Sequence, residues 1–67
     1  MKALVNGEAV EVDDVRTIAD LVQQITGSAE QRGLAVARNG EVVRRDDWSQ
    51  AVRDGDEIEI VRAVQGG

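Results

Sequence analysis

The sequence predicts a single α+β domain in which one main helix packs across a mixed sheet of four or five strands. Two Asn-Gly pairs each separate short apolar runs, a pattern typical of β-hairpins with tight turns. Between these hairpins lies one stretch whose apolar residues recur at the spacing of an amphipathic helix. At 67 residues, the chain has room for only one small core.

Residues 1–12 are predicted to form the first hairpin, closed by an Asn-Gly turn of type I′. This turn fixes the register, so that Lys2 lies opposite Glu11. Residues opposite each other share a face of the sheet, and the apolar residues on the core face are Met1, Ala3, Val5, Val10 and Val12. Leu4 and Ala9 are expected on the outer, solvated face.

Residues 17–27 carry the clearest helix pattern, with an apolar stripe made of Ile18, Leu21, Val22 and Ile25. Thr17 is suited to cap the start, Asp20 lies in the positively polarised first turn, and Gly27 suits the left-handed position after the end. We expect this helix to lie across the inner face of the first hairpin. The residues expected to point outward are Gln23, Gln24 and Ala19.

A second hairpin is predicted from residues 34–38 and 41–44, which flank the second Asn-Gly pair. The residues expected to face the helix are Leu34, Val36 and Val43. A charge run at 44–47 then precedes Trp48, Ala51 and Val52, which are spaced as in one helical turn. Trp48 is the only aromatic residue, and we expect it to close one end of the core. The alternative is a docking anchor beside Arg44 and Arg45.

Residues 54–56 predict a turn, and residues 57–61 alternate as a half-buried strand. Ile58 and Ile60 should point inward. The alternation places Val61 and Ala63 outward, where they and Val64 would form a partner-contact surface. The alternative is a twist or bulge that turns these residues inward.

Composition limits the possible functions. The chain has no His, Cys or Tyr, which removes the commonest general base, the commonest neutral metal ligand and any thiolate nucleophile or thiolate zinc site, so we expect neither a metal site nor an enzyme. Thirteen acidic against eight basic residues give a net charge of −5, which disfavours nucleic acid and anionic membranes as partners. The first residues lack the apolar run of a signal peptide, so we expect a cytoplasmic protein that binds a basic or apolar face of another protein.

The sequence ends in Gln65, Gly66 and Gly67. Two glycines have no Cβ and can pass through a slot too narrow for side chains. The reactive group of this tail is the α-carboxylate of Gly67, which is ionised at neutral pH because its pKa is ordinarily about 3.3–3.7. These three residues can extend on the order of 10 Å into a partner. The alternative is an ordinary frayed terminus.

This order of elements resembles the β-grasp or ubiquitin-like fold. Local motifs narrow the resemblance, and they are NGEVV at 39–43, RDDW at 45–48, DGDEIEI at 54–60 and AVQGG at 63–67. Together they resemble the ThiS family of sulfur carriers in thiamin thiazole biosynthesis, over essentially the whole chain. One departure is Arg44, where family members often have proline.

The resemblance implies a β-grasp domain at residues 1–64 and a flexible Gly-Gly tail at 65–67. It further implies that a ThiF-like enzyme adenylates Gly67 with ATP and Mg²⁺, and that a persulfide on another protein supplies sulfur. The resulting thiocarboxylate would serve a ThiG-like thiazole synthase. The chain itself would bind no cofactor and be monomeric when free. The alternatives are a MoaD-like carrier for molybdopterin synthesis, a ubiquitin-like modifier joined to lysines through Gly67, and a β-grasp interaction module.

Overall fold

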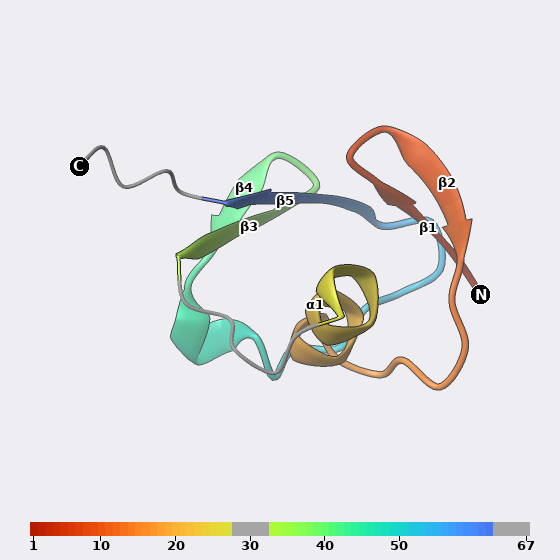
Figure 1. Cartoon of the computed structure of the whole chain (residues 1–67), viewed down its shortest axis with the longest axis horizontal. Helices are drawn as coiled ribbons and strands as arrows, with labels where there is room; N and C mark the ends of the chain where they lie inside the picture. Colours follow the sequence, from red (N-terminus) through yellow and green to blue (C-terminus); the bar gives the residue numbers. More distant parts are fainter. Residues whose placement is uncertain (28–32, 63–67) are drawn as a thin grey trace.

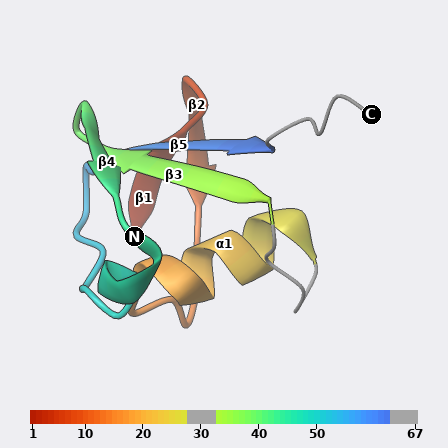
Figure 2. The same ribbon diagram turned by 90° about the vertical axis from the view of Figure 1, so that its left-hand side faces the viewer.

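In the part of the chain that the structure describes, five strands form one mixed sheet and one α-helix packs against one of its faces (Figures 1 and 2). The computed structural model describes residues 1–27 and 33–62. The strands are β1 (Lys2–Val5), β2 (Glu8–Glu11), β3 (Leu34–Arg38), β4 (Glu41–Val43) and β5 (Glu57–Arg62). The helix α1 spans Ile18–Thr26, and a short 3₁₀ helix η1 spans Arg45–Asp47. The predicted α+β class is confirmed, and the sheet has five strands rather than four.

Both predicted hairpins form with the predicted registers. In the first hairpin Lys2 lies opposite Glu11, and in the second Arg38 lies opposite Glu41. The predicted core residues of the first hairpin are buried or half-buried, whereas Leu4 on the outer face is 37% exposed. β4 ends at Val43, one residue earlier than predicted, because the carbonyl of Arg44 already accepts the first turn bond of η1, 2.7 Å from the amide nitrogen of Asp47.

The last strand lies in the middle of the sheet, whose order is β2-β1-β5-β3-β4 (Figure 1). β5 runs parallel to β1, with Val5 beside Ile58, and antiparallel to β3, with Val36 beside Ile60. This placement joins the two hairpins into one sheet. It also leaves Ile58 1% exposed, with its side chain in the core under α1.

Helix α1 begins and ends at the residues that the sequence indicates. The Thr17 hydroxyl accepts the amide of Asp20, the Asp20 carboxylate accepts the amide of Thr17, and Gly27 ends the helix at φ 68°. Ile18, Leu21 and Val22 are fully buried, whereas Ile25, in the last turn, is 36% exposed.

The expectation that Ala19 points outward was wrong, because Ala19 is half-buried against the core. The first turn of α1 lies against the segment that follows η1. There the amide of Ala19 donates to the carbonyl of Trp48 over 3.0 Å, and the amide of Ile18 donates to the backbone carbonyl of Gln50 over 3.1 Å.

Trp48 closes one end of the core, as predicted. It is 4% exposed, and its indole Nε1–H donates to the carbonyl of Val43 over 3.2 Å. The guanidinium of Arg45 lies 4.5 Å from the centre of the indole ring, within the range of a cation–π contact. The alternative role as an exposed docking anchor was therefore wrong. Of the two residues spaced with Trp48, Val52 is buried and Ala51 is exposed, because this segment is a turn rather than a helix.

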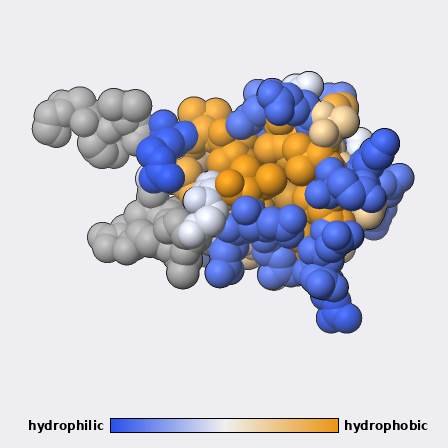
Figure 3. All heavy atoms as spheres, turned by 45° about the vertical axis from the view of Figure 1, so that its right-hand side comes forward, coloured by the Kyte–Doolittle hydropathy of each residue, from blue (hydrophilic) through white to orange (hydrophobic). Residues whose placement is uncertain are grey.

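The core reaches the surface along one side of the molecule, where Figure 3 shows an apolar area bordered by hydrophilic side chains. Seven half-buried apolar residues pack around the buried core: Met1, Val10, Val15, Ala19, Leu34, Val43 and Ile60. These residues lie at the edge of the core and stay partly exposed.

The contribution of the Asp20 carboxylate to the stability of the fold depends on pH. Hydrogen bonds from the amides of Arg16 and Thr17 hold the pKa of Asp20 below its usual value. A lowered folded-state pKa stabilises the fold above the unfolded-state value of about 3.9, and this contribution disappears as the pH falls through the folded-state pKa. Asp20→Asn keeps an acceptor oxygen and removes the charge. We expect a lower melting temperature at neutral pH and a difference from wild type that shrinks on acidification.

Thermal unfolding followed by circular dichroism over a pH series measures this difference. Asp13→Asn removes a charge from the loop that precedes the helix and serves as the control. A melting difference for Asp20→Asn that stayed constant from neutral to acidic pH would contradict the assignment.

Candidate functional site

The candidate site is the carboxyl end of β5 and the sheet face around it. Val61 points away from α1 and is 57% exposed, as its place in the alternation predicts. Its role in partner contact stays a prediction. The other residues predicted for this site, Ala63, Val64, Gln65, Gly66 and Gly67, lie outside the described residues.

Apolar side chains continue from Val61 across the outer face of the sheet. Val61 lies opposite Ala35 on β3, and Ala37, two residues further along β3, lies opposite Val42 on β4. Residues opposite each other share a face, so these four residues form one row, which we call the outer-face strip. Val42 is 79% exposed. Ala35 and Val61 are also exposed, and Ala37 is half-buried. Apolar residues gathered on three strands in this way form a surface on which another protein can bury area.

Acidic side chains border the outer-face strip. Glu59 lies opposite Ala37 on the same face. Glu57, two residues before Glu59 in β5, points to the same face and lies opposite Leu4. An apolar row with an acidic border fits a partner surface that is apolar at its centre and basic at its rim.

Two asparagine side chains hold β5 from opposite sides, and sequence reasoning assigned them only to turns. The Asn6 side chain exchanges two hydrogen bonds with the backbone of Ile60, at 2.9 and 3.2 Å. The side-chain carbonyl oxygen of Asn39 accepts a hydrogen bond from the backbone amide of Glu57 over 3.0 Å. An Asn-Gly pair in a sequence predicts only the turn. Hydrogen bonds from the asparagine side chain to β5 cannot be predicted in this way, because they require a strand from a distant part of the sequence to lie beside the turn.

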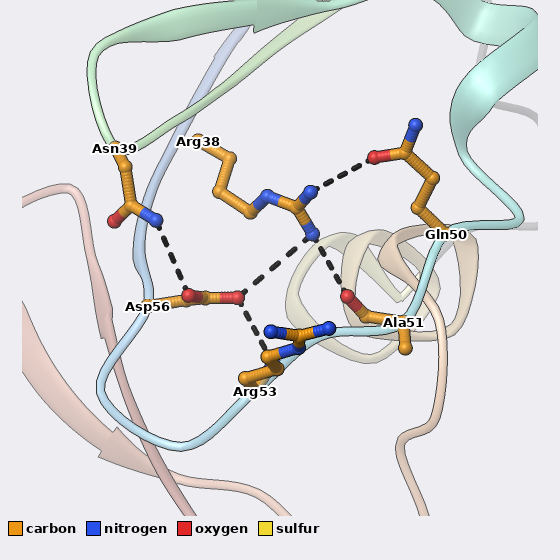
Figure 4. A pocket seen from close by; sticks show the side chains of 6 residues that line it. All are labelled: Arg38, Asn39, Gln50, Ala51, Arg53 and Asp56. Atoms are coloured by element: carbon orange, nitrogen blue, oxygen red, sulfur yellow. Dashed lines mark hydrogen bonds and ion pairs between the residues drawn. The ribbon is translucent and has the colours of Figure 1, made fainter.

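A hollow at the start of β5 contains the one buried carboxylate of the described residues, that of Asp56 (Figure 4). Asp56 accepts the amide of Arg53 over 2.9 Å and the side-chain amide of Asn39 over 3.3 Å, and it lies 4.0 Å from the Arg38 guanidinium. Arg38 also donates to the carbonyl of Ala51 and to the side chain of Gln50, both over 2.8 Å.

This network ties the segment after η1 to the β3–β4 turn. Its charged groups already bond to one another and to the backbone, so the hollow acts as a structural joint. The sequence marked residues 54–56 only as a turn.

No group of three or more His, Cys, Asp or Glu side chains in residues 1–27 and 33–62 could hold a metal ion. Within the same ranges, no helix is long and apolar enough to cross a membrane.

Comparison with known proteins decides the family. The model of the ThiS family matches residues 3–67, which is nearly the whole chain and includes the Gly-Gly end. The chain belongs to the ThiS family. The family resemblance read from the sequence motifs is thereby confirmed.

Two relatives match this ThiS family member over their whole length, and the solved structure of one of them has the same fold. It is 34% identical to the sulfur carrier protein ThiS of Escherichia coli K12, and the match covers all of both chains. The crystal structure of the thiamine biosynthesis protein ThiS from Geobacter metallireducens superposes with a TM-score of 0.79 at 30% identity, again over all of both chains. The predicted β-grasp fold is therefore confirmed.

A third relative is longer. The chain is 37% identical to part of a thiazole synthase from Paramagnetospirillum magneticum, and the match covers all of this chain but 20% of that protein. A ThiS-like segment and a thiazole synthase thus occur there in one polypeptide.

Proposed function

We propose that this ThiS-family protein carries sulfur on its C-terminal carboxylate for thiamin biosynthesis. In this role the protein is a co-substrate, because its own terminal carboxylate is converted and regenerated while its partner enzymes catalyse the reactions. The observation that carries the proposal is the family match through Gly67, on a chain whose central strand β5 leads directly to that end.

The chemistry follows from the properties of a carboxylate. A carboxylate is a poor electrophile, because its charge is delocalised and an oxide ion would have to leave. Transfer of AMP from ATP to Gly67, with release of pyrophosphate, forms a mixed anhydride. The terminal sulfur of a persulfide donor then attacks the acyl carbon and AMP leaves, which joins Gly67 to the donor through an acyl disulfide. A thiol of a partner protein then attacks the donor's sulfur, so that the S–S bond breaks, a disulfide forms on the partner and the thiocarboxylate of Gly67 is released. ATP and Mg²⁺ would bind to the adenylating partner, and this chain would hold no cofactor.

Two enzyme partners follow from this sequence of reactions, a ThiF-like adenylating enzyme and a ThiG-like thiazole synthase. The longer relative supports the second partner, because its thiazole synthase and ThiS-like segment share one chain. The outer-face strip supports docking of the body. Val61 would begin a contact surface that continues through Ala63 and Val64, while Gln65 and Gly66 would bring Gly67 into the partner's active site.

The proposal divides the chain into a β-grasp domain at residues 1–64 and a Gly-Gly tail at 65–67. Because adenylation of Gly67 consumes ATP, we expect the carrier to act in the cytoplasm. We also expect the free carrier to be a monomer that exchanges one enzyme partner for another.

Intact-mass spectrometry tests the sulfur-carrier function directly. We expect that incubation with a ThiF-like enzyme, ATP and a persulfide donor replaces one oxygen by sulfur at the terminus. Omission of ATP is the control. A conjugate to lysine would instead indicate a ubiquitin-like modifier, and an unchanged mass would indicate an interaction module. A thiocarboxylate that supports molybdopterin synthesis, and not thiazole synthesis, would indicate a MoaD-like carrier.

Gly67→Ala tests the reason for a terminal glycine. The change adds one methyl group five residues beyond the end of β5, so we expect an unchanged melting temperature. The added Cβ should obstruct a narrow adenylation site and lower the rate of ATP–pyrophosphate exchange on the order of a hundredfold. Normal exchange by the variant would refute the steric argument. Exchange without added carrier gives the background.

Val61→Asp tests docking through the outer-face strip. A charge in the exposed apolar row should raise the KM for the carrier in the exchange assay by about tenfold and leave the fold intact. Ala9→Asp places the same charge on β2, at the far edge of the same face, and should leave KM unchanged. Equal effects of the two substitutions would show that net charge, and not the strip, controls binding.

A further inference from the structure

Support for β5 differs between its two sides. On one side β3 accompanies the strand to its end, with Leu34 opposite Arg62. On the other side β1 pairs only at Leu4 and Val5, because the chain then turns back at residues 6 and 7. The last residues of β5, from Ile60 onward, therefore extend past the end of their parallel neighbour β1.

The side chain of Asn6 occupies the position where the next ladder step of β1 would be. Its backbone amide donates to the carbonyl of Ile58 over 2.9 Å, which is the last backbone bond of this ladder. Its side-chain carbonyl oxygen accepts the amide of Ile60 over 2.9 Å, and its side-chain nitrogen donates to the carbonyl of Ile60 over 3.2 Å. A carboxamide has the same donor and acceptor as a peptide group, so it can imitate one further step of the ladder.

We propose that Asn6 is a positioning residue for the C-terminal tail, an inference that rests on the proposed sulfur-carrier function. Ile60 is the last residue of β5 that is held on both sides, and only Val61 and Arg62 separate it from residue 63. Fixing Ile60 from both sides fixes the direction in which the chain leaves the sheet. That direction decides whether Gly67 meets the α-phosphate of ATP when the outer-face strip is docked.

The chemistry of acyl activation makes such positioning effective. The carboxylate must approach the phosphorus in line with the departing pyrophosphate, and a displacement of the order of 1 Å can lower a rate by about a hundredfold. Both Asn6 side-chain bonds lie on the exposed surface, where water competes for the same groups. Their loss should therefore change the position of the strand end more than the stability of the fold.

Asn39 offers a matched comparison within the same chain. Like Asn6 it precedes a glycine in a tight turn, and the two residues have nearly the same positive φ, 50° and 51°. Its side chain also accepts a backbone amide of β5, that of Glu57. Glu57 is the first residue of β5 and lies at the end remote from the tail.

Asn6→Gly and Asn39→Gly separate positioning from turn formation. Glycine adopts positive φ without strain, so each substitution removes the side-chain bonds and preserves the turn. In ATP–pyrophosphate exchange with a ThiF-like enzyme, we expect Asn6→Gly to lower kcat by about tenfold while KM for the carrier stays unchanged. Asn39→Gly should leave both constants at the wild-type value. Asn6→Asp keeps the acceptor and loses the donor, and it should fall between Asn6→Gly and wild type.

Amide hydrogen exchange supplies a readout that is independent of activity. Asn6→Gly should accelerate exchange at Ile60, and Asn39→Gly at Glu57. Equal kcat losses in the two glycine variants, or a wild-type kcat in Asn6→Gly, would overturn the positioning role. Failure of the proposed function is distinguishable, because wild-type carrier would then give no exchange at all.

Discussion

The parallel pairing of the first and last strands is the interaction on which the rest of this structure depends. The amide of Leu4 donates to the carbonyl of Asp56, and that of Asn6 donates to the carbonyl of Ile58, both over 2.9 Å. Without these bonds the hairpin of β1 and β2 would be separate from the three-stranded sheet of β5, β3 and β4, and neither part alone would form the whole inner face. With them, β5 becomes the central strand of one five-stranded sheet.

This arrangement gives the two faces of the sheet different tasks. The inner face packs against α1 and Trp48, and a buried residue such as Trp48 matters greatly in a small core, since its removal typically costs about 3–5 kcal/mol of the ~5–15 kcal/mol that stabilises a whole domain. The outer face carries the apolar strip, which needs no covering for the fold to be stable. In the proposed function, docking on the outer-face strip and release from it would leave the core undisturbed.

Central placement also determines where the polar side chains act. The two Asn-Gly turns lie on opposite sides of β5, so that Asn6 bonds near its end and Asn39 at its start. Asp56 and Arg38 join the same region to the segment after η1. These contacts hold β5 on both sides, from Glu57 to Ile60.

The sequence alone determined the local structure, because that information is carried by neighbouring residues. Asn-Gly turns fixed both hairpin registers, Thr17, Asp20 and Gly27 marked the helix ends, and the closing motif with Gly67 indicated the family and its chemistry. Only the tertiary structure decided which strand lies beside which. The burial of Ala19, the second role of Asn6 and the joint at Asp56 all depend on contacts between residues far apart in the chain, and no local pattern records such contacts.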